Sequence, residues 1–154
     1  MLSRTIEKNL ILINIEAENF EEAIRKSTAP LVTDGFVTQN YVDRIIEISQ
    51  ETGPYIVITK NVALPHAPGD SGAIKTTLGF TKLKNPVISG NKANDPVKYL
   101  FPLSASDSSS HIELLSELAT LLGSQEFIDQ LETIDSKEGF ITLLQKFEGG
   151  NTHA

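Results

Sequence analysis

The sequence predicts an α/β fold, a layered sandwich in which helices pack against a mixed β-sheet. Apolar residues recur at helical spacing near the start of the chain and again over its last third, while the middle holds short β-branched runs bounded by turn residues. Elements with one apolar face must bury it, so the outer helices are expected to cover the sheet. The 154 residues fit one domain, which we place at residues 1–148, followed by a flexible C-terminal tail at residues 149–154.

The N-terminal third is expected to hold one strand and two helices. Residues 10–15 form a short apolar run, and residues 20–26 then have helical spacing. Thr38 can cap a second helix, because its hydroxyl can accept a hydrogen bond from an N–H of the first turn, and helical spacing continues to Gln50. Gly53 and the proline after it should end this helix.

The middle of the chain is expected to be mostly sheet. Four β-branched runs are predicted as strands, at residues 55–59, 76–81, 87–88 and 97–103. The first run leads into a loop at residues 61–72 that contains His66, and the turn formers Asn85 and Pro86 separate the second run from the third.

The pattern returns to helical spacing at Asp107. One helix should run from there to Gly123, with a broad apolar face made of Ile112, Leu114, Leu115, Leu118, Leu121 and Leu122. Two shorter helices follow, opened by Ser124 and Ser136.

Composition excludes several classes of function. The net charge of −7 argues against nucleic-acid binding, because nothing would neutralise a row of phosphates. The chain has no cysteine, which excludes disulfides, thiolate catalysis and thiolate metal sites. No apolar run is long enough to span a bilayer and the N-terminus lacks the order of a secretory signal, so we expect a cytoplasmic protein without direct membrane insertion.

Two histidines are candidates for an ordered site, because the third, His153, falls in the expected tail. His66 follows Pro65, whose fixed φ stiffens the chain, at a point where a strand gives way to a loop. His111 lies in the first turn of the long helix, where free backbone N–H groups favour an anion. Both positions also fit structural roles, as a surface loop histidine and as part of a helix cap.

One chemistry uses both histidines. A neutral imidazole nitrogen of His66 can attack a phosphoryl group, while His111 stabilises the charge on the transferred oxygens. Such a carrier needs no cofactor, because phosphoryl transfer depends mainly on positioning and electrostatics. The other ring nitrogen of His66 should be held by a backbone carbonyl or a carboxylate, which fixes the tautomer.

Two other chemistries have weaker signals. A metal could be held by His66, His111, Asp70 and Glu113, but no HxH or HExxH spacing supports this site. A serine hydrolase could use the serines at 108–110, but no GxSxG motif surrounds them.

Four blocks of sequence occur in a fixed order along nearly the whole chain. They are Gly53-Pro54-Tyr55-Ile56-Val57-Ile58, Ala63-Leu64-Pro65-His66-Ala67, Asn94-Asp95-Pro96-Val97 and Ser110-His111-Ile112-Glu113-Leu114-Leu115-Ser116-Glu117-Leu118-Ala119. In order and spacing they resemble the enzyme IIA domain of sugar phosphotransferase systems, in the mannitol and fructose (type 2) superfamily.

The resemblance implies roles for both histidines. His66, after its Leu-Pro pair, matches the residue that accepts a phosphoryl group from the phosphocarrier protein HPr and gives it to an enzyme IIB component. His111 matches a second histidine beside the phosphorylated ring. Mannitol-type members carry an arginine late in the second helix, where this chain has Ile48, with Arg44 one turn earlier.

The first two blocks are more similar to the ascorbate-type branch, in which a IIB cysteine is the acceptor. The resemblance therefore implies a phosphotransferase that powers uptake of a sugar, or of ascorbate, by a membrane permease on another chain. A regulatory module that signals by its phosphorylation state is the alternative, and a non-catalytic domain is a third. The sequence indicates neither the transported compound nor the oligomeric state.

Overall fold

The computed structural model of the chain describes residues 2–152, apart from the side chains of residues 108, 110, 111 and 149–152. Its central sheet has five strands in the spatial order β1 (Ile11–Ile15), β5 (Phe80–Val87), β6 (Val97–Leu100), β3 (Val62–Ala63) and β2 (Val57–Thr59). β1 pairs parallel with β5, and β3 pairs parallel with β6, whereas β5 with β6 and β2 with β3 are antiparallel. A small second sheet pairs β4 (Thr77–Leu78) antiparallel with β7 (Leu103–Ser104).

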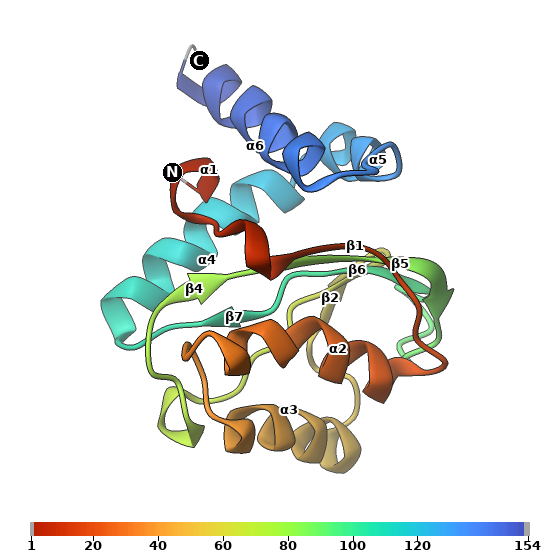
Figure 1. The fold of residues 1–154 in the computed structure, drawn as a ribbon. Helices are drawn as coiled ribbons and strands as arrows, with labels where there is room; N and C mark the ends of the chain where they lie inside the picture. The colour runs from red at the N-terminus through yellow and green to blue at the C-terminus, as the bar shows by residue number, and fades with distance from the viewer. Residues whose placement is uncertain (1, 153–154) are drawn as a thin grey trace.

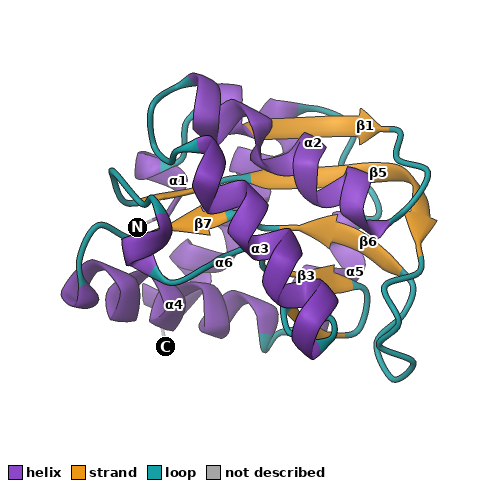
Figure 2. Ribbon diagram, turned by 90° about the horizontal axis from the view of Figure 1, so that it is seen from below, coloured by secondary structure: helices purple, strands orange, loops and turns teal. Residues whose placement is uncertain are grey.

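Helices cover both faces of the mixed sheet (Figures 1 and 2). On one face lie α2 (Phe20–Thr33) and α3 (Gln39–Thr52). On the other lie α4 (Ser108–Leu122), α5 (Gln125–Leu131), α6 (Lys137–Thr152) and the short α1 (Leu2–Thr5). The predicted α/β layered sandwich is therefore confirmed.

Two apolar cores form, one on each face of the sheet. Successive strand residues point to opposite faces, so neighbours in sequence enter different cores. Val62 and Tyr99 pack with α4, α5 and α6, whereas the residues that follow them, Ala63 and Leu100, pack with α2 and α3. The sheet therefore forms a rigid platform beneath the loop that carries His66.

Local signals placed the helix ends correctly. The hydroxyl of Thr38 accepts a hydrogen bond from the N–H of Tyr41, and that of Ser124 accepts one from Phe127, as expected for N-caps. Gly53 follows α3 with a φ of 95°, a conformation that favours glycine.

Some predicted boundaries are wrong. β5 continues through Asn85 and Pro86, where a turn was predicted, and includes Val87. Pro86 has no N–H for the ladder, but the pairing of β5 with β6 is irregular between Lys82 and Val87 and does not require one. β3 lies inside the predicted loop, and α1 was not predicted. α6 extends to Thr152 and residues 153–154 lie outside the described residues, so the flexible tail stays a prediction.

Candidate functional site

His66 borders an open cavity of about 850 Å³. The cavity is bounded by α3, the segment between α3 and β2, the loop after His66 and the chain that enters α4. Its described lining residues are Tyr41, Ile48, Tyr55, His66, Ala67, Pro68, Gly69, Asp70, Ala105, Ser106, Asp107 and Ile112. A small group bound to the His66 ring therefore has room beside it.

Backbone hydrogen bonds anchor the segment before His66 on both sides. The N–H of Leu64 donates to the carbonyl of Ile56 over 2.8 Å, and the N–H of Leu103 donates to the carbonyl of Pro65 over 3.0 Å. Because this segment continues directly from β3, the position of His66 is set by the sheet.

The imidazole of His66 makes a short contact with its own loop. Its Nδ1 lies 2.5 Å from the carbonyl oxygen of Leu64. A carbonyl only accepts hydrogen bonds, so Nδ1 carries the proton of the neutral ring and the lone pair is on Nε2. The backbone carbonyl expected to fix the tautomer is thus that of Leu64, and Nε2 carries the lone pair of the neutral ring.

Tyr55 touches both the backbone and the ring of His66. Its hydroxyl donates to the carbonyl oxygen of His66, and its ring stands edge-on to the imidazole with 5.4 Å between centroids and 71° between planes. Burial raises the pKa of the Tyr55 hydroxyl to about 12, with a further rise from Tyr41 and an opposing effect of the Arg44 charge. The hydroxyl therefore stays protonated near neutral pH and acts as a donor. The sequence reasoning gave this residue no role at the site: it placed Tyr55 in a predicted strand and in the first of the four blocks that carry the resemblance.

Tyr41 connects α3 to β7 by a hydrogen bond. Its buried hydroxyl donates to the carbonyl of Leu103 over 2.9 Å, and Leu103 in turn holds the carbonyl of Pro65. Burial raises the pKa of Tyr41, partly offset by a hydrogen bond with the backbone of Ala67. The loop on either side of His66 is therefore braced by two tyrosines.

The start of α4 borders the same cavity. Asp107, just before the helix, and Ile112, in its second turn, both line the cavity, so the backbone of His111 lies between two lining residues. The side chain of His111 lies outside the described residues. The N-terminal turn of a helix carries partial positive charge, and here Asp107 and Ile112 place that turn at the border of the cavity.

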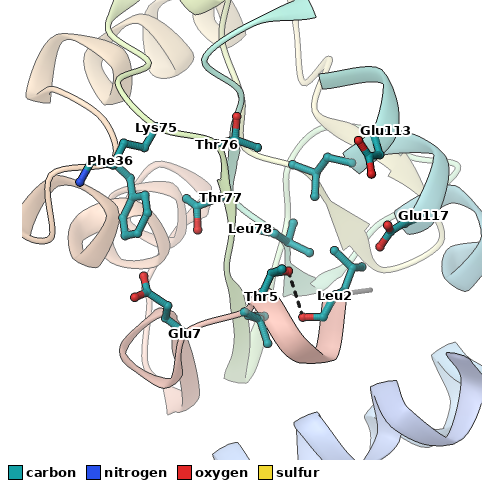
Figure 3. Close-up of a pocket in the computed structure, with 12 residues that line it drawn as sticks. Leu2, Thr5, Glu7, Phe36, Lys75, Thr76, Thr77, Leu78, Glu113 and Glu117 are labelled. Carbon is teal, nitrogen blue, oxygen red and sulfur yellow. Dashed lines mark hydrogen bonds between the residues drawn. The ribbon is translucent and has the colours of Figure 1, made fainter. Parts of the chain in front are cut away.

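The residues considered as metal ligands are not all in one place. Asp70 lines the His66 cavity, whereas Glu113 lines a separate cavity of about 520 Å³ between α1, β4 and α4. Figure 3 shows Glu113 and Glu117 on α4 facing this second cavity across from Leu2 and Thr5. Among the described side chains, no group of three or more histidines, cysteines or carboxylates is arranged to hold a metal ion.

No helix over the described part of the chain has the length and apolar character needed to cross a membrane.

Comparison with known proteins identifies relatives along nearly the whole chain. A family model described as "Phosphoenolpyruvate-dependent sugar phosphotransferase system, EIIA 2" matches residues 4–147. The mannitol-specific cryptic phosphotransferase enzyme IIA component of Escherichia coli (strain K12) is 32% identical over 146 residues, covering 94% of this chain and 98% of the relative. The solution structure of the E. coli component of that name has a TM-score of 0.86 at 31% identity, covering 94% of this chain and 98% of that one.

Two further relatives extend the comparison. The ascorbate-specific EIIA component of E. coli (strain K12) is 28% identical over 141 residues, covering 91% of this chain and 92% of the relative. A chain in the complex of enzyme IIAMTL and phosphorylated enzyme IIBMTL from E. coli shares the fold, with a TM-score of 0.79 at 23% identity, and the match covers 92% of this chain and 98% of that one. Components with mannitol and ascorbate in their names are thus both similar to this chain. With its family match and its relatives spanning almost its full length, the chain belongs to the EIIA 2 family of the phosphoenolpyruvate-dependent sugar phosphotransferase system.

Proposed function

We propose that the protein is a phosphoryl carrier in which Nε2 of His66 accepts a phosphoryl group from phospho-HPr and passes it to a cysteine of a separate enzyme IIB. The observation that carries this proposal is the 2.5 Å contact between Nδ1 of His66 and the Leu64 carbonyl, which directs the lone pair to Nε2 at an open cavity.

The transfer is a pair of substitutions at phosphorus. In the first, the Nε2 lone pair forms a bond to phosphorus while the bond from phosphorus to the donor breaks. Nδ1 keeps its proton, and the Leu64 carbonyl stabilises the positive charge that the ring acquires. In the second, a cysteine thiolate of the IIB protein attacks phosphorus, the Nε2–phosphorus bond breaks, and the ring returns to its starting state. The 154 residues contain no cysteine, so the proposed acceptor cysteine lies outside them.

The start of α4 supports the phosphoryl oxygens in this proposal. Backbone N–H groups of the first helical turn carry partial positive charge, and Asp107 and Ile112 bring that turn to the cavity. We assign His111 as the electrostatic partner of phosphorylated His66, on the basis of its place in this turn and of the family resemblance. No cofactor is required.

The partners in this proposal are HPr, an enzyme IIB and, indirectly, a membrane permease. The solved complex of a similarly folded IIA chain with phosphorylated IIB gives a precedent for the IIB partner. A cytoplasmic location belongs to the same proposal. The compound transported is a sugar or ascorbate, since relatives of both specificities are similar to this chain.

Labelling with isotopic phosphoenolpyruvate tests the assignment. In the presence of enzyme I and HPr the wild-type protein should be labelled, and ³¹P–¹⁵N NMR should place the phosphorus on Nε2. A His66→Ala variant should remain folded and unlabelled, and equal labelling of this variant would refute the proposal. Release of the label to a IIB protein supports the transport role, whereas labelling with no onward transfer favours the regulatory alternative.

A further inference from the structure

The described lining of the His66 cavity does not supply a formal positive charge for a phosphoryl group. It contains two carboxylates, Asp70 and Asp107, and no lysine or arginine. A phosphoryl group carries about two negative charges at neutral pH. A cation at the edge of the cavity would offset both the group and the carboxylates.

Arg44 does not line the cavity, but the register of α3 places it next to two residues that do. Tyr41 and Ile48 both line the cavity, and Arg44 is three residues after the first and four before the second. Residues at these spacings share one face of a helix. The Cα–Cβ bond of Arg44 tilts toward the turn that carries Tyr41, as in any helix, although the guanidinium itself lies on Glu47, toward the C-terminus.

The charge of Arg44 affects a residue that lines the cavity. It lowers the pKa of Tyr55, against the larger rise caused by burial. The Tyr55 hydroxyl donates directly to the carbonyl of His66. The charge of Arg44 therefore acts on a residue that is hydrogen-bonded to His66.

The present partner of Arg44 holds it weakly. Its guanidinium pairs with Glu47, three residues further along α3, and the side chains are 38% and 57% exposed. Exposed pairs of this kind contribute little to stability, because water competes for both charges. A guanidinium can form two parallel hydrogen bonds to a phosphoryl group, which makes exchange of partner favourable.

We propose that Arg44 binds the phosphoryl group on His66, leaving Glu47 when the histidine is phosphorylated. This inference rests on the proposed carrier function and adds the residue that holds the transferred group. Arg44 then stabilises the charge on the phosphoryl oxygens during transfer, and Glu47 competes with them for the guanidinium.

Three variants test this role against a matched control. Arg44→Gln removes the charge, Arg44→Lys keeps a charge without the planar fork, and Glu47→Gln removes the competitor. Arg25→Gln is the control, because Arg25 also pairs with exposed carboxylates on the same layer of helices, but its charge is not among those that shift the pKa of Tyr55. Each protein is phosphorylated with phospho-HPr and, separately, with phosphoramidate, a small donor that needs no protein docking.

Arg44→Gln should slow phosphorylation by both donors by about 100-fold, at the lower end of the range for loss of a charge-stabilising donor. The phosphorylation rate of Arg44→Lys should lie between those of wild type and Arg44→Gln. Glu47→Gln should be phosphorylated at the wild-type rate or faster, and Arg25→Gln at the wild-type rate. The ³¹P resonance of phosphorylated His66 should shift in Arg44→Gln and not in Arg25→Gln.

Several results would overturn the role of Arg44. These are wild-type rates for Arg44→Gln, an equal loss in Arg25→Gln, or a loss with phospho-HPr but not with phosphoramidate, which would mean that Arg44 only docks the donor protein. In each case the wild-type protein is still labelled on His66. If instead the wild-type protein is not labelled at all, the carrier function itself fails.

Discussion

Replacement of Tyr55 by phenylalanine removes one hydroxyl beside His66 and leaves the aromatic ring. The hydroxyl donates to the carbonyl oxygen of His66, whereas the edge-on ring contact, with 5.4 Å between centroids, does not depend on it. The Tyr55→Phe variant therefore separates the hydrogen bond from the packing of the two rings.

The expected magnitude follows from one lost hydrogen bond at a half-buried position. An unsatisfied buried acceptor costs about 1–3 kcal/mol, and partial access of water to the His66 carbonyl favours the lower end, about 1 kcal/mol. For a chain of this size that cost lowers the melting temperature by about 2–4 °C. If the same free energy is lost from the positioning of Nε2 in the transition state, phosphorylation slows by about fivefold.

The assay is the initial rate of labelling from phospho-HPr, measured together with thermal unfolding. Tyr99→Phe is the matched control, because the Tyr99 hydroxyl donates to the Glu132 carboxylate and lines a different cavity. The control should lose stability and keep the wild-type labelling rate. Because burial raises the pKa of Tyr55 to about 12, the hydroxyl stays protonated and the ratio of variant to wild-type rate should be constant from about pH 6 to 9.

A wild-type labelling rate in Tyr55→Phe, at a melting temperature lowered as expected, would refute the positioning role. The hydroxyl would then stabilise the fold without influencing His66. An equal loss of rate in Tyr99→Phe would refute it too, because the effect would then follow stability alone.

Two further predictions concern stability. Thr38→Ala removes the hydroxyl that accepts from the N–H of Tyr41 at the start of α3, and should cost about 1 kcal/mol of unfolding free energy, so an unchanged urea midpoint would contradict the cap. Asp95 accepts hydrogen bonds from Ser89 and Gly90, which outweigh the effect of burial and lower the pKa of its carboxyl. Its contribution is therefore present above the unfolded-state pKa of about 4 and is lost as the pH falls through the lower folded value. Asp95→Asn should thus be less stable than wild type at pH 7, with a deficit that shrinks as the pH is lowered below about 4, whereas a deficit independent of pH would contradict the reasoning.

The parts of the fold that depend on neighbours in sequence were predictable. The cap of α3 joins Thr38 to Tyr41, three residues apart, and the positive φ of Gly53 ends the same helix. β3 was not predictable in the same way, because two residues are too few to show a period of two. Its existence depends on pairing with β6, more than thirty residues later in the chain.

The candidate site was predictable to a smaller extent. The strand-to-loop position of His66 suggested a reactive group, and the need for an acceptor at its second ring nitrogen followed from chemistry alone. Which carbonyl accepts depends on how the backbone turns between Leu64 and His66, and no residue preference reports that. Tyr55 was missed because an aromatic residue beside a β-branched run is usually explained by packing, and its hydrogen bond joins it to a residue eleven positions later in the chain.

Helix register linked the sequence of the second helix to the lining of the cavity. Counting along the second helix placed Ile48 where an arginine is expected in mannitol-type members, and Ile48 does line the cavity of His66. The same count could not decide where Arg44 acts, because a helix face is meaningful only once it is known what it faces. The structure shows what this face of the helix borders. Tyr41 and Ile48 both line the cavity, so Arg44, which lies between them on the same face, is next to the lining. Under the proposed role of Arg44, a cation one helical turn earlier than the arginine of mannitol-type members serves the same space.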